Sequence, residues 1–393
     1  MRATPIACCT IAAALAFLPG AGSVQARTLL VGPGAGIEHV ADAARVAQDG
    51  DIVEILPGDY RGDVAVWTQK SLTIRGVGRM PRMVADGQNV EGKAIWVLRN
   101  GDFLIENIAF TGARVEDHTG AGIRFERGRL TVRNSLFTDN EIGLMTSNDA
   151  ESALTIENSE FAQAPRDRGQ LKHLLYVGAI RRLQVTGSRF HGGFEGHLIK
   201  SRARENQIRY NFIYDGPTGK AAYELEFPNG GIAFVIGNVV GQSRDTTNPV
   251  VIAYGAEGSR WTDNGLYLSH NTLISDRWSG TWFLRVWSSR LPVETEIVAV
   301  NNLTVGLGVF DLGAPGQFAG NVPLLQWALG DPDTLDFRLA EQSVLRGRGV
   351  VPPSYRGQSL APSFEFAFPI GLEPIPAQPS WTPGAFQSTR LSP

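Results

Sequence analysis

Short runs in which apolar and polar residues alternate recur along most of the chain, and they end in a common way. Each run closes with an apolar residue, a small residue that is usually Asn, and an aromatic or apolar residue three positions further on. The small residue of each unit is Asn107, Asn134, Asn158, Gly187, Asn211, Asn238, Asn271 or Asn302. These positions are separated by 27, 24, 29, 24, 27, 33 and 31 residues. The period of two predicts strands, and the spacing predicts one structural repeat per interval.

Repeated strands at this spacing predict an all-β protein, a single-stranded parallel β-helix. Equivalent strands of successive coils would pair about 4.8 Å apart, so that residues far apart in sequence form columns on a flat face. The small polar residues are expected to form a hydrogen-bonded ladder, and the aromatic residues are expected to stack inside the coils. The expected stack contains Phe110, Phe137, Phe161 and Phe190.

One helical pattern precedes the repeats. Ile37, Val40, Ala41 and Ala44 fall on one face of a helix that Gly50 could end. Because an open sheet end would recruit other chains, a helix at this place is expected to cap the first coil.

Residues 1–26 have the pattern of a secretory signal peptide, with Arg2, an apolar core at 11–18 and small residues before position 27. Cys8 and Cys9 both lie within it, so the mature chain would have neither disulfides nor thiolate metal sites. No second apolar stretch is long enough to span a bilayer. We therefore expect a secreted or periplasmic protein without a membrane partner. Its β-helix and cap would cover residues 27–311, and the last coil and a Pro-rich tail would cover 312–393.

The polar columns are the candidate site. Tyr176, Lys200 and Glu224 recur at intervals of 24 residues, as do Arg202 and Glu226. If Ile199 and Ser201 point inward, strand alternation turns Lys200, Arg202, Tyr176, Glu224 and Glu226 outward. His173 and His197 occupy equivalent positions and could stack on one another. The alternative interpretation is that Lys200–Glu224 and Arg202–Glu226 are ion pairs that only fix the register between coils.

Charge indicates the class of partner. Residues 165–209 contain ten Lys or Arg residues against three acidic ones, although the formal net charge of the whole chain is −3. An acidic polysaccharide could bind there, unless the residues form only a solvated basic face. Nucleic acid is not expected, because no recognition motif is present. Further candidates for substrate binding are Arg204, Arg124, Asn229, Trp282 and Arg285.

At this level the chain resembles the pectate-lyase-like superfamily of right-handed parallel β-helix proteins. The resemblance rests on the repeats together with segments 49–60, 72–78 and 384–387. It implies the architecture, but not one activity, because lyases, hydrolases, epimerases, esterases and phage spikes share the fold.

A narrower resemblance surrounds Lys200. Lys200-Ser201, Glu205-Asn206 and Asn211 are similar to the run around the catalytic lysine of the chondroitinase B and alginate lyase family. Glu195 matches one carboxylate with which that family binds calcium, but Gly193 stands at the position of the other. The family's Arg-His-Gly segment, which carries its catalytic arginine, is replaced here by residues 224–231.

These residues lead us to expect β-elimination of a uronate polymer. Lys200 would be the base, Arg202 or His197 would neutralise the carboxylate, and Tyr176 or His173 would protonate the leaving oxygen. Two alternatives are a glycoside hydrolase that uses Glu224 and Glu226, about 7 Å apart along one strand, and a non-catalytic carbohydrate-binding or structural protein. No cofactor is expected, with calcium at Glu195 as the alternative. The sequence leaves the identity of the polymer and the oligomeric state open.

Overall fold

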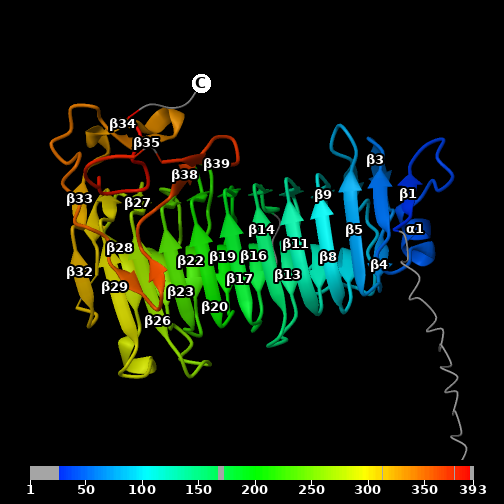
Figure 1. The fold of residues 1–393 in the computed structure, drawn as a ribbon, viewed down its shortest axis with the longest axis horizontal. Coiled ribbons are helices and arrows are strands. Elements are labelled where there is room, and N and C mark those ends of the chain that lie inside the picture. Colours follow the sequence, from blue (N-terminus) through cyan, green and yellow to red (C-terminus); the bar gives the residue numbers. More distant parts are fainter. Residues whose placement is uncertain (1–25, 167–171, 312, 376, 390–393) are drawn as a thin grey trace, which may run out of the picture.

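The computed structural model describes residues 26–166, 172–311, 313–375 and 377–389. The expected signal peptide therefore lies outside the described residues, apart from its last position. The described chain winds through three long parallel sheets, called A, B and C here, and contributes one strand to each sheet per coil (Figure 1). This is the predicted parallel β-helix.

Each sheet grows by one strand per coil along the helix axis. Sheet A contains β1 (Thr28–Val31), β2 (Ile52–Ile55), β5 (Ser71–Gly76), β8 (Gly101–Glu106), β11 (Gly128–Arg133), β14 (Ala153–Glu157), β17 (Arg182–Thr186), β20 (Glu205–Arg209), β23 (Ile232–Ile236), β26 (Gly265–Ser269), β29 (Glu296–Val300) and β32 (Gln317–Ala319). Sheet B contains β3 (Asp59–Arg61), β6 (Arg82–Val84), β9 (Ala109–Thr111), β12 (Leu136–Thr138), β15 (Glu160–Ala162), β18 (Arg189–His191), β21 (Phe212–Tyr214), β24 (Val239–Gln242), β27 (Thr272–Ser275), β30 (Leu303–Val305) and β33 (Val322–Leu324). Sheet C contains β4 (Ala65–Trp67), β7 (Ala94–Leu98), β10 (Ala121–Phe125), β13 (Ile142–Thr146), β16 (His173–Val177), β19 (His197–Ser201), β22 (Tyr223–Phe227), β25 (Val250–Tyr254), β28 (Thr281–Val286) and β31 (Gly308–Val309).

The interior confirms the expected aromatic stack. The ring centroids of Phe110, Phe137, Phe161 and Phe190 follow one another at 5.1, 4.5 and 4.8 Å, with nearly parallel planes. All four side chains are buried. Because the rings belong to successive strands of sheet B, each coil extends the same stack, and the stack fixes the register of the coils.

The polar ladder differs from the prediction by one residue in the first coils. Asn211, Asn238, Asn271 and Asn302 form a buried ladder, in which each side-chain amide bonds to the next across coils. In the earlier coils the ladder position is taken by Ser135, Ser159 and Ser188, whose hydroxyls accept bonds from neighbouring backbone amides. The preceding residues Asn107, Asn134 and Asn158 instead adopt a left-handed φ, from 46 to 56°. Asn158 is therefore a turn residue and not a ladder member.

A short helix closes the first coil. Helix α1 (Val40–Val46) buries Val40, Ala43 and Ala44 and lies beside β1 at the N-terminal end of the described chain (Figure 1). The Asp63 carboxylate accepts hydrogen bonds from the first amides of the helix at 2.7 and 2.8 Å. A helix forms where the sequence predicts it, although Ala43 and not Ala41 completes the buried face, and the helix ends before Gly50.

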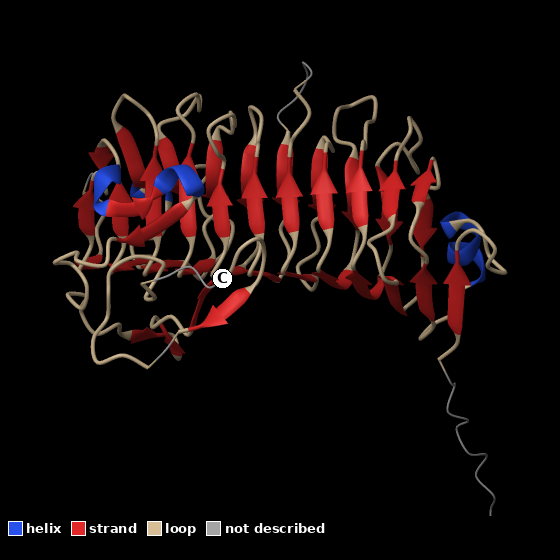
Figure 2. Ribbon diagram, turned by 90° about the horizontal axis from the view of Figure 1, so that it is seen from above, coloured by secondary structure: helices blue, strands red, loops and turns tan. Residues whose placement is uncertain are grey.

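Beyond Leu324 the chain leaves the coils and packs back on them (Figures 1 and 2). Its short elements are η2 (Gln326–Ala328), β34 (Leu329–Asp331), η3 (Pro332–Thr334), β35 (Asp336–Leu339), β36 (Ser354–Tyr355), β37 (Gln358–Ser359), β38 (Phe364–Phe366) and β39 (Leu372–Pro374). Phe337 and Phe366 pack on Phe212 of sheet B, and the amide of Ala385 donates to the hydroxyl of Thr272 at 3.0 Å. The tail also packs on sheet A, where the Tyr267 ring lies 5.3 Å from the Tyr355 ring. The tail thus covers parts of sheets A and B. In the described ranges, no helix has the length and hydrophobicity needed to cross a lipid bilayer.

Candidate functional site

The strands of sheet C do not alternate strictly between the two faces. In β19, both Leu198 and Ile199 are fully buried within the hydrophobic core. The register pairs His197 with Tyr223, Ile199 with Leu225 and Lys200 with Glu226 of β22. His197 and Lys200, three positions apart, therefore lie on the same outer face of the sheet.

Two outer columns follow from this geometry. The first contains Ala121, Ile142, His173, His197, Tyr223, Val250 and Trp282. The second contains Arg124, Met145, Tyr176, Lys200, Glu226, Ala253 and Arg285. In the coils before β16, the residues of the first column are apolar and buried. Val97, which precedes Arg124 in the second column, is also apolar and buried. Both positions become polar together in β16, β19 and β22, which marks these three coils as the candidate site.

The sequence-based pairing of Lys200 with Glu224 is wrong. Tyr176 does pair with Lys200, as predicted, but the next partner of Lys200 is Glu226. The turn before β22, residues 215–222, is three residues longer than the turn before β19, residues 192–196. The turn after β19, residues 202–204, is one residue shorter than the turn after β16, residues 178–181, so β22 is shifted by two positions in all. The expected pairing of Arg202 with Glu226 is wrong for the same reason.

Glu224 is not on the outer face. It lies between Tyr223 and Leu225, opposite Leu198, and its exposed fraction is 0%. Neither carboxylate oxygen has a hydrogen-bond partner among the described residues. The expected hydrolytic pair of Glu224 and Glu226 on one outer face is therefore not formed.

Glu226 is at the centre of the polar cluster. Its Oε2 lies 2.7 Å from Nε2 of His197 and 3.2 Å from Nζ of Lys200. The other ring nitrogen of His197, Nδ1, lies 3.1 Å from Nδ1 of His173, and the two rings are 4.8 Å apart. The Tyr223 ring stacks on His197 at 5.0 Å. The two histidines are neighbours, as predicted, and they are buried beneath the lysine.

Arg202 organises the exposed side of the cluster. Its guanidinium binds the Glu257 carboxylate through two nitrogens, at 2.6 and 3.0 Å, and Nζ of Lys200 reaches the same carboxylate at 3.2 Å. Nε of Arg202 donates to the Tyr176 hydroxyl at 3.1 Å, and Asn229 accepts a further hydrogen bond from Nη1. The cluster thus holds one carboxylate of the chain itself between an arginine and a lysine.

The electrostatics explain which groups are ionised. Burial alone would raise the pKa of Glu226, but His197 and Lys200 offset it and hold that pKa below its ordinary value. Burial lowers the pKa of His197, more than Glu226 raises it, and lowers the pKa of His173 much further with the help of neighbouring cations. The hydrogen bond from Arg202 lowers the pKa of Glu257. At neutral pH the cluster therefore contains neutral histidines between charged carboxylates and cations.

The remaining predicted residues lie around this cluster. Arg124 is partly buried in the Lys200 column, where its guanidinium contacts the Met145 sulfur at 2.7 Å, and burial lowers its pKa. Arg285 lies at the other end of the column, 4.1 Å from the Trp282 ring and 4.5 Å from the Trp287 ring. Arg204 is exposed in the turn after β19. The column therefore carries guanidinium groups on both sides of Lys200.

Sequence reasoning missed Glu257 and Tyr223. Glu257 comes from the loop after β25, which is fixed by a hydrogen bond from the Trp261 indole to the Arg202 carbonyl at 3.1 Å. That loop lies outside the repeat, so no periodic signal could have assigned Glu257 to this site. Tyr223 could have been found from the correct register, since it occupies the His197 column.

The residues around Glu195 do not fit calcium. Glu195 is exposed, and Gly193 offers no side-chain oxygen. Over the described parts of the chain, no group of three or more His, Cys, Asp and Glu side chains is placed to hold a metal ion. Calcium prefers six to eight oxygen ligands, so a single carboxylate here is a poor site.

The buried state of Glu224 leads to a prediction. Burial, together with the nearby Asp215, raises the pKa of Glu224 well above its ordinary value of 4.5. As the pH rises above 4.5, the unfolded chain releases this proton while the folded chain retains it, so stability falls. Glu224→Gln should therefore raise the thermal midpoint at pH 7, by about 1–2 °C for each kcal/mol gained in a chain of this length, and the gain should vanish below about pH 4.5.

Glu226→Gln is the matched control. The pKa of Glu226 is lowered in the folded chain, so its ionised form stabilises the fold above pH 4.5. This variant should lower the thermal midpoint at pH 7. Melting curves from pH 4 to pH 8 measure whether each substitution raises or lowers the thermal midpoint. If the parent protein were more stable than Glu224→Gln at pH 7, Glu224 would not be a buried, protonated side chain.

Comparison with known proteins bears on the architecture. No protein-family model matches this sequence, and no curated protein matches it. Among solved structures, pectate lyase Pel9A is similar, with a TM-score of 0.65 and 13% sequence identity over 93% of this chain and 97% of that chain. At such low identity the similarity concerns the fold alone. The chain has three long parallel sheets that wind around an internal aromatic stack. Together with this similarity, these features show that it has the parallel β-helix fold of the pectate-lyase-like proteins.

Proposed function

We propose that the protein acts on an acidic, uronate-containing polysaccharide and cleaves it by β-elimination at the sheet C cluster. The observation that supports this most is the carboxylate of Glu257, held by Arg202 and Lys200 through contacts of 2.6 to 3.2 Å. A uronate carries the same chemical group, so the pair that binds Glu257 can bind the substrate carboxylate in its place. The planar guanidinium of Arg202 can donate hydrogen bonds to both carboxylate oxygens, which fixes the orientation of the bound uronate.

Carboxylate binding also supplies the first requirement of the chemistry. Elimination removes the proton α to the carboxylate, and that proton becomes acidic only when the negative charge is neutralised. In this proposal the substrate carboxylate displaces Glu257 and is held by Arg202, which is the clamp. Lys200 then releases its ammonium proton to solvent and, as the neutral amine, takes the α-proton as the base. The Tyr176 hydroxyl, 3.1 Å from Nε of Arg202, protonates the leaving glycosidic oxygen. His173 and His197 are buried, so their role is to position Glu226 and Lys200.

Glu257→Gln tests carboxylate displacement. The neutral amide binds Arg202 and Lys200 less strongly, so a polyuronate should compete better. We expect binding of the polymer to tighten about tenfold, equivalent to about 1.4 kcal/mol, measured by titration calorimetry at fixed salt. Glu151→Gln, in an exposed turn, removes the same charge elsewhere and should leave the affinity unchanged. Equal or weaker binding by Glu257→Gln would argue against displacement.

A second candidate function is polysaccharide binding without cleavage. It is favoured by the pairing of Lys200 with both Glu226 and Glu257, which leaves its side chain only 13% exposed. Incubation with alginate, pectate, glucuronan and glycosaminoglycans separates the two functions, because elimination creates an unsaturated product that absorbs near the ultraviolet edge. Saturable binding of a polymer with no new absorbance would support the second candidate.

We propose that the site works without calcium. The Arg202 guanidinium can neutralise a uronate without a metal ion, and the surroundings of Glu195 do not supply the oxygens that calcium needs. Activity or binding should therefore persist in a chelator and fall steeply as salt is added, because exposed charges are screened within about 8 Å at physiological ionic strength. Loss of activity or binding in the chelator, followed by recovery when calcium is added, would contradict a calcium-independent site. An extracellular polysaccharide as the substrate agrees with the secreted or periplasmic location that residues 1–26 lead us to expect.

A further inference from the structure

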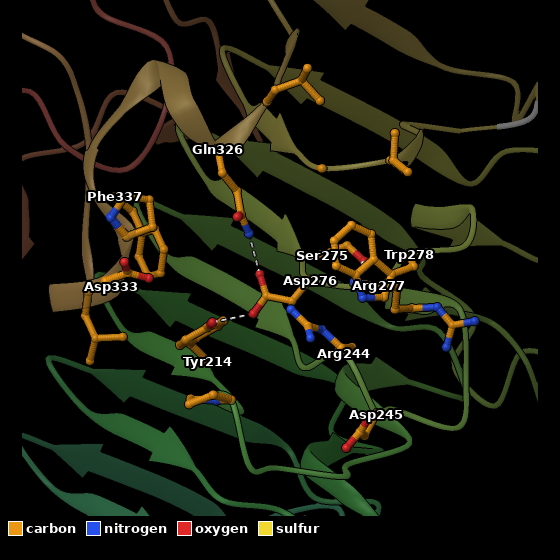
Figure 3. Close-up of a pocket in the computed structure, with 16 residues that line it drawn as sticks. Tyr214, Arg244, Asp245, Ser275, Asp276, Arg277, Trp278, Gln326, Asp333 and Phe337 are labelled. Carbon is orange, nitrogen blue, oxygen red and sulfur yellow. Dashed lines mark hydrogen bonds between the residues drawn. The ribbon is translucent and has the colours of Figure 1, made fainter.

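A concave site lies at the corner between sheets B and C of the last coils, apart from the sheet C cluster. A cavity of about 660 Å³ opens there, between the loops that follow β21, β24, β27 and β30 and the tail segment 325–337 (Figure 3). Its lining shares no residue with the sheet C cluster. The volume falls within the range typical of small-molecule sites in proteins.

Asp276 is the central polar group of this cavity. Its Oδ2 accepts a hydrogen bond from the Tyr214 hydroxyl at 2.5 Å, and its Oδ1 accepts one from the Gln326 amide at 2.6 Å (Figure 3). Tyr214 ends a strand of sheet B, whereas Gln326 belongs to η2 of the tail. Segments more than a hundred residues apart thus bring an acid, an amide and a phenol to one wall.

An aromatic ring lies beside this polar wall. Trp278 follows Asp276 in the same loop, and it is 77% exposed, which is unusual for a large apolar side chain. The Arg244 guanidinium lies 5.0 Å from the centre of its ring. A flat indole beside hydrogen-bonding groups matches a ligand with one apolar face and a rim of hydroxyls.

We propose that this cavity is a second carbohydrate site, which binds a neutral pyranose unit of a glycan. The sugar ring would stack on Trp278, and its hydroxyls would bond with Asp276, Gln326 and Arg244. The charge of the lining favours a neutral sugar over a uronate, because Asp245, Asp276 and Asp333 outnumber Arg244 and Arg277. The site is independent of carboxylate binding on sheet C, so the protein can hold a glycan at two separate places.

Calorimetric titration with cellohexaose, xylohexaose, mannohexaose and galactotetraose tests this proposal, with trigalacturonate as the anionic comparison. We expect saturable binding of at least one neutral oligosaccharide. Trp278→Ala and Asp276→Asn should each weaken that binding at least tenfold. Trp278 is exposed, so its removal leaves the fold intact.

Two controls locate the effect. Trp327→Ala removes a similarly exposed indole, 82% exposed, that lines an adjoining hollow but not this cavity, and it should leave the binding unchanged. Lys200→Ala should also leave neutral-sugar binding unchanged, which separates this site from the function proposed for sheet C. Absence of binding by all four neutral sugars, binding of trigalacturonate alone, or unchanged binding by Trp278→Ala would each overturn the proposal.

Discussion

Lys200→Arg is expected to abolish cleavage of the polyuronate while leaving polymer binding nearly unchanged. Arginine keeps the positive charge and can still pair with Glu226 and Glu257, but it cannot give up its proton and so cannot act as a base. Loss of general-base catalysis lowers turnover by about 10²- to 10⁴-fold. The rate of new absorbance near the ultraviolet edge measures turnover, and calorimetry measures binding.

Two further variants make the result specific. Lys220→Arg is the same substitution in an exposed turn and should leave turnover unchanged. Lys200→Ala should lose turnover and also weaken binding, because it removes one of the two cations that hold the carboxylate. Its thermal midpoint should fall, because the buried Glu226 loses one of its two charged neighbours. A normally folded Lys200→Arg or Lys200→Ala protein with parental turnover would exclude Lys200 as the base.

Phe161→Ala is expected to cause the largest loss of stability. Phe161 is fully buried, and its ring lies 4.5 Å from Phe137 and 4.8 Å from Phe190, so truncation leaves a cavity in the middle of the stack. Removal of a buried phenylalanine costs about 3–5 kcal/mol. Guanidinium chloride unfolding checks the loss. Phe318→Ala, at a position 39% exposed in the last coil, should cost far less, and equal losses at the two positions would contradict a central role for the stack.

The repeat pattern alone was sufficient to predict the architecture. Each coil requires strands that alternate with period two, small residues at the turns and an aromatic residue at a fixed offset. Because these requirements are local, the same pattern recurs in the sequence of every coil. The stack from Phe110 to Phe190 and the pairing of Tyr176 with Lys200 follow from these local rules. The helix at the first coil was predicted from a separate helical pattern. The pairing of Tyr176 with Lys200 could be predicted because the coil between them has the 24-residue length of the repeat.

The ladder could be predicted only in kind. Each turn contains a residue with left-handed φ followed by a ladder residue, and both positions accept Asn. Asn158 and Ser159 are therefore equally good candidates from sequence. The structure assigns the ladder to Ser159, because its hydroxyl is buried and bonds to the adjacent coil.

The candidate site depended on tertiary structure, for three physical reasons. The longer turn before β22 shifts the register, so Glu226 and not Glu224 meets Lys200. Two successive residues of β19 point inward, so His197 shares a face with Lys200, which strict alternation forbids.

The third reason is that loops outside the repeat complete both sites. Glu257 reaches Arg202 from the loop after β25, and Gln326 reaches Asp276 from the tail. Periodicity therefore determined which residues form the coils and the stack. The partners of each charge were decided by turn length and by long-range packing, which no local pattern encodes.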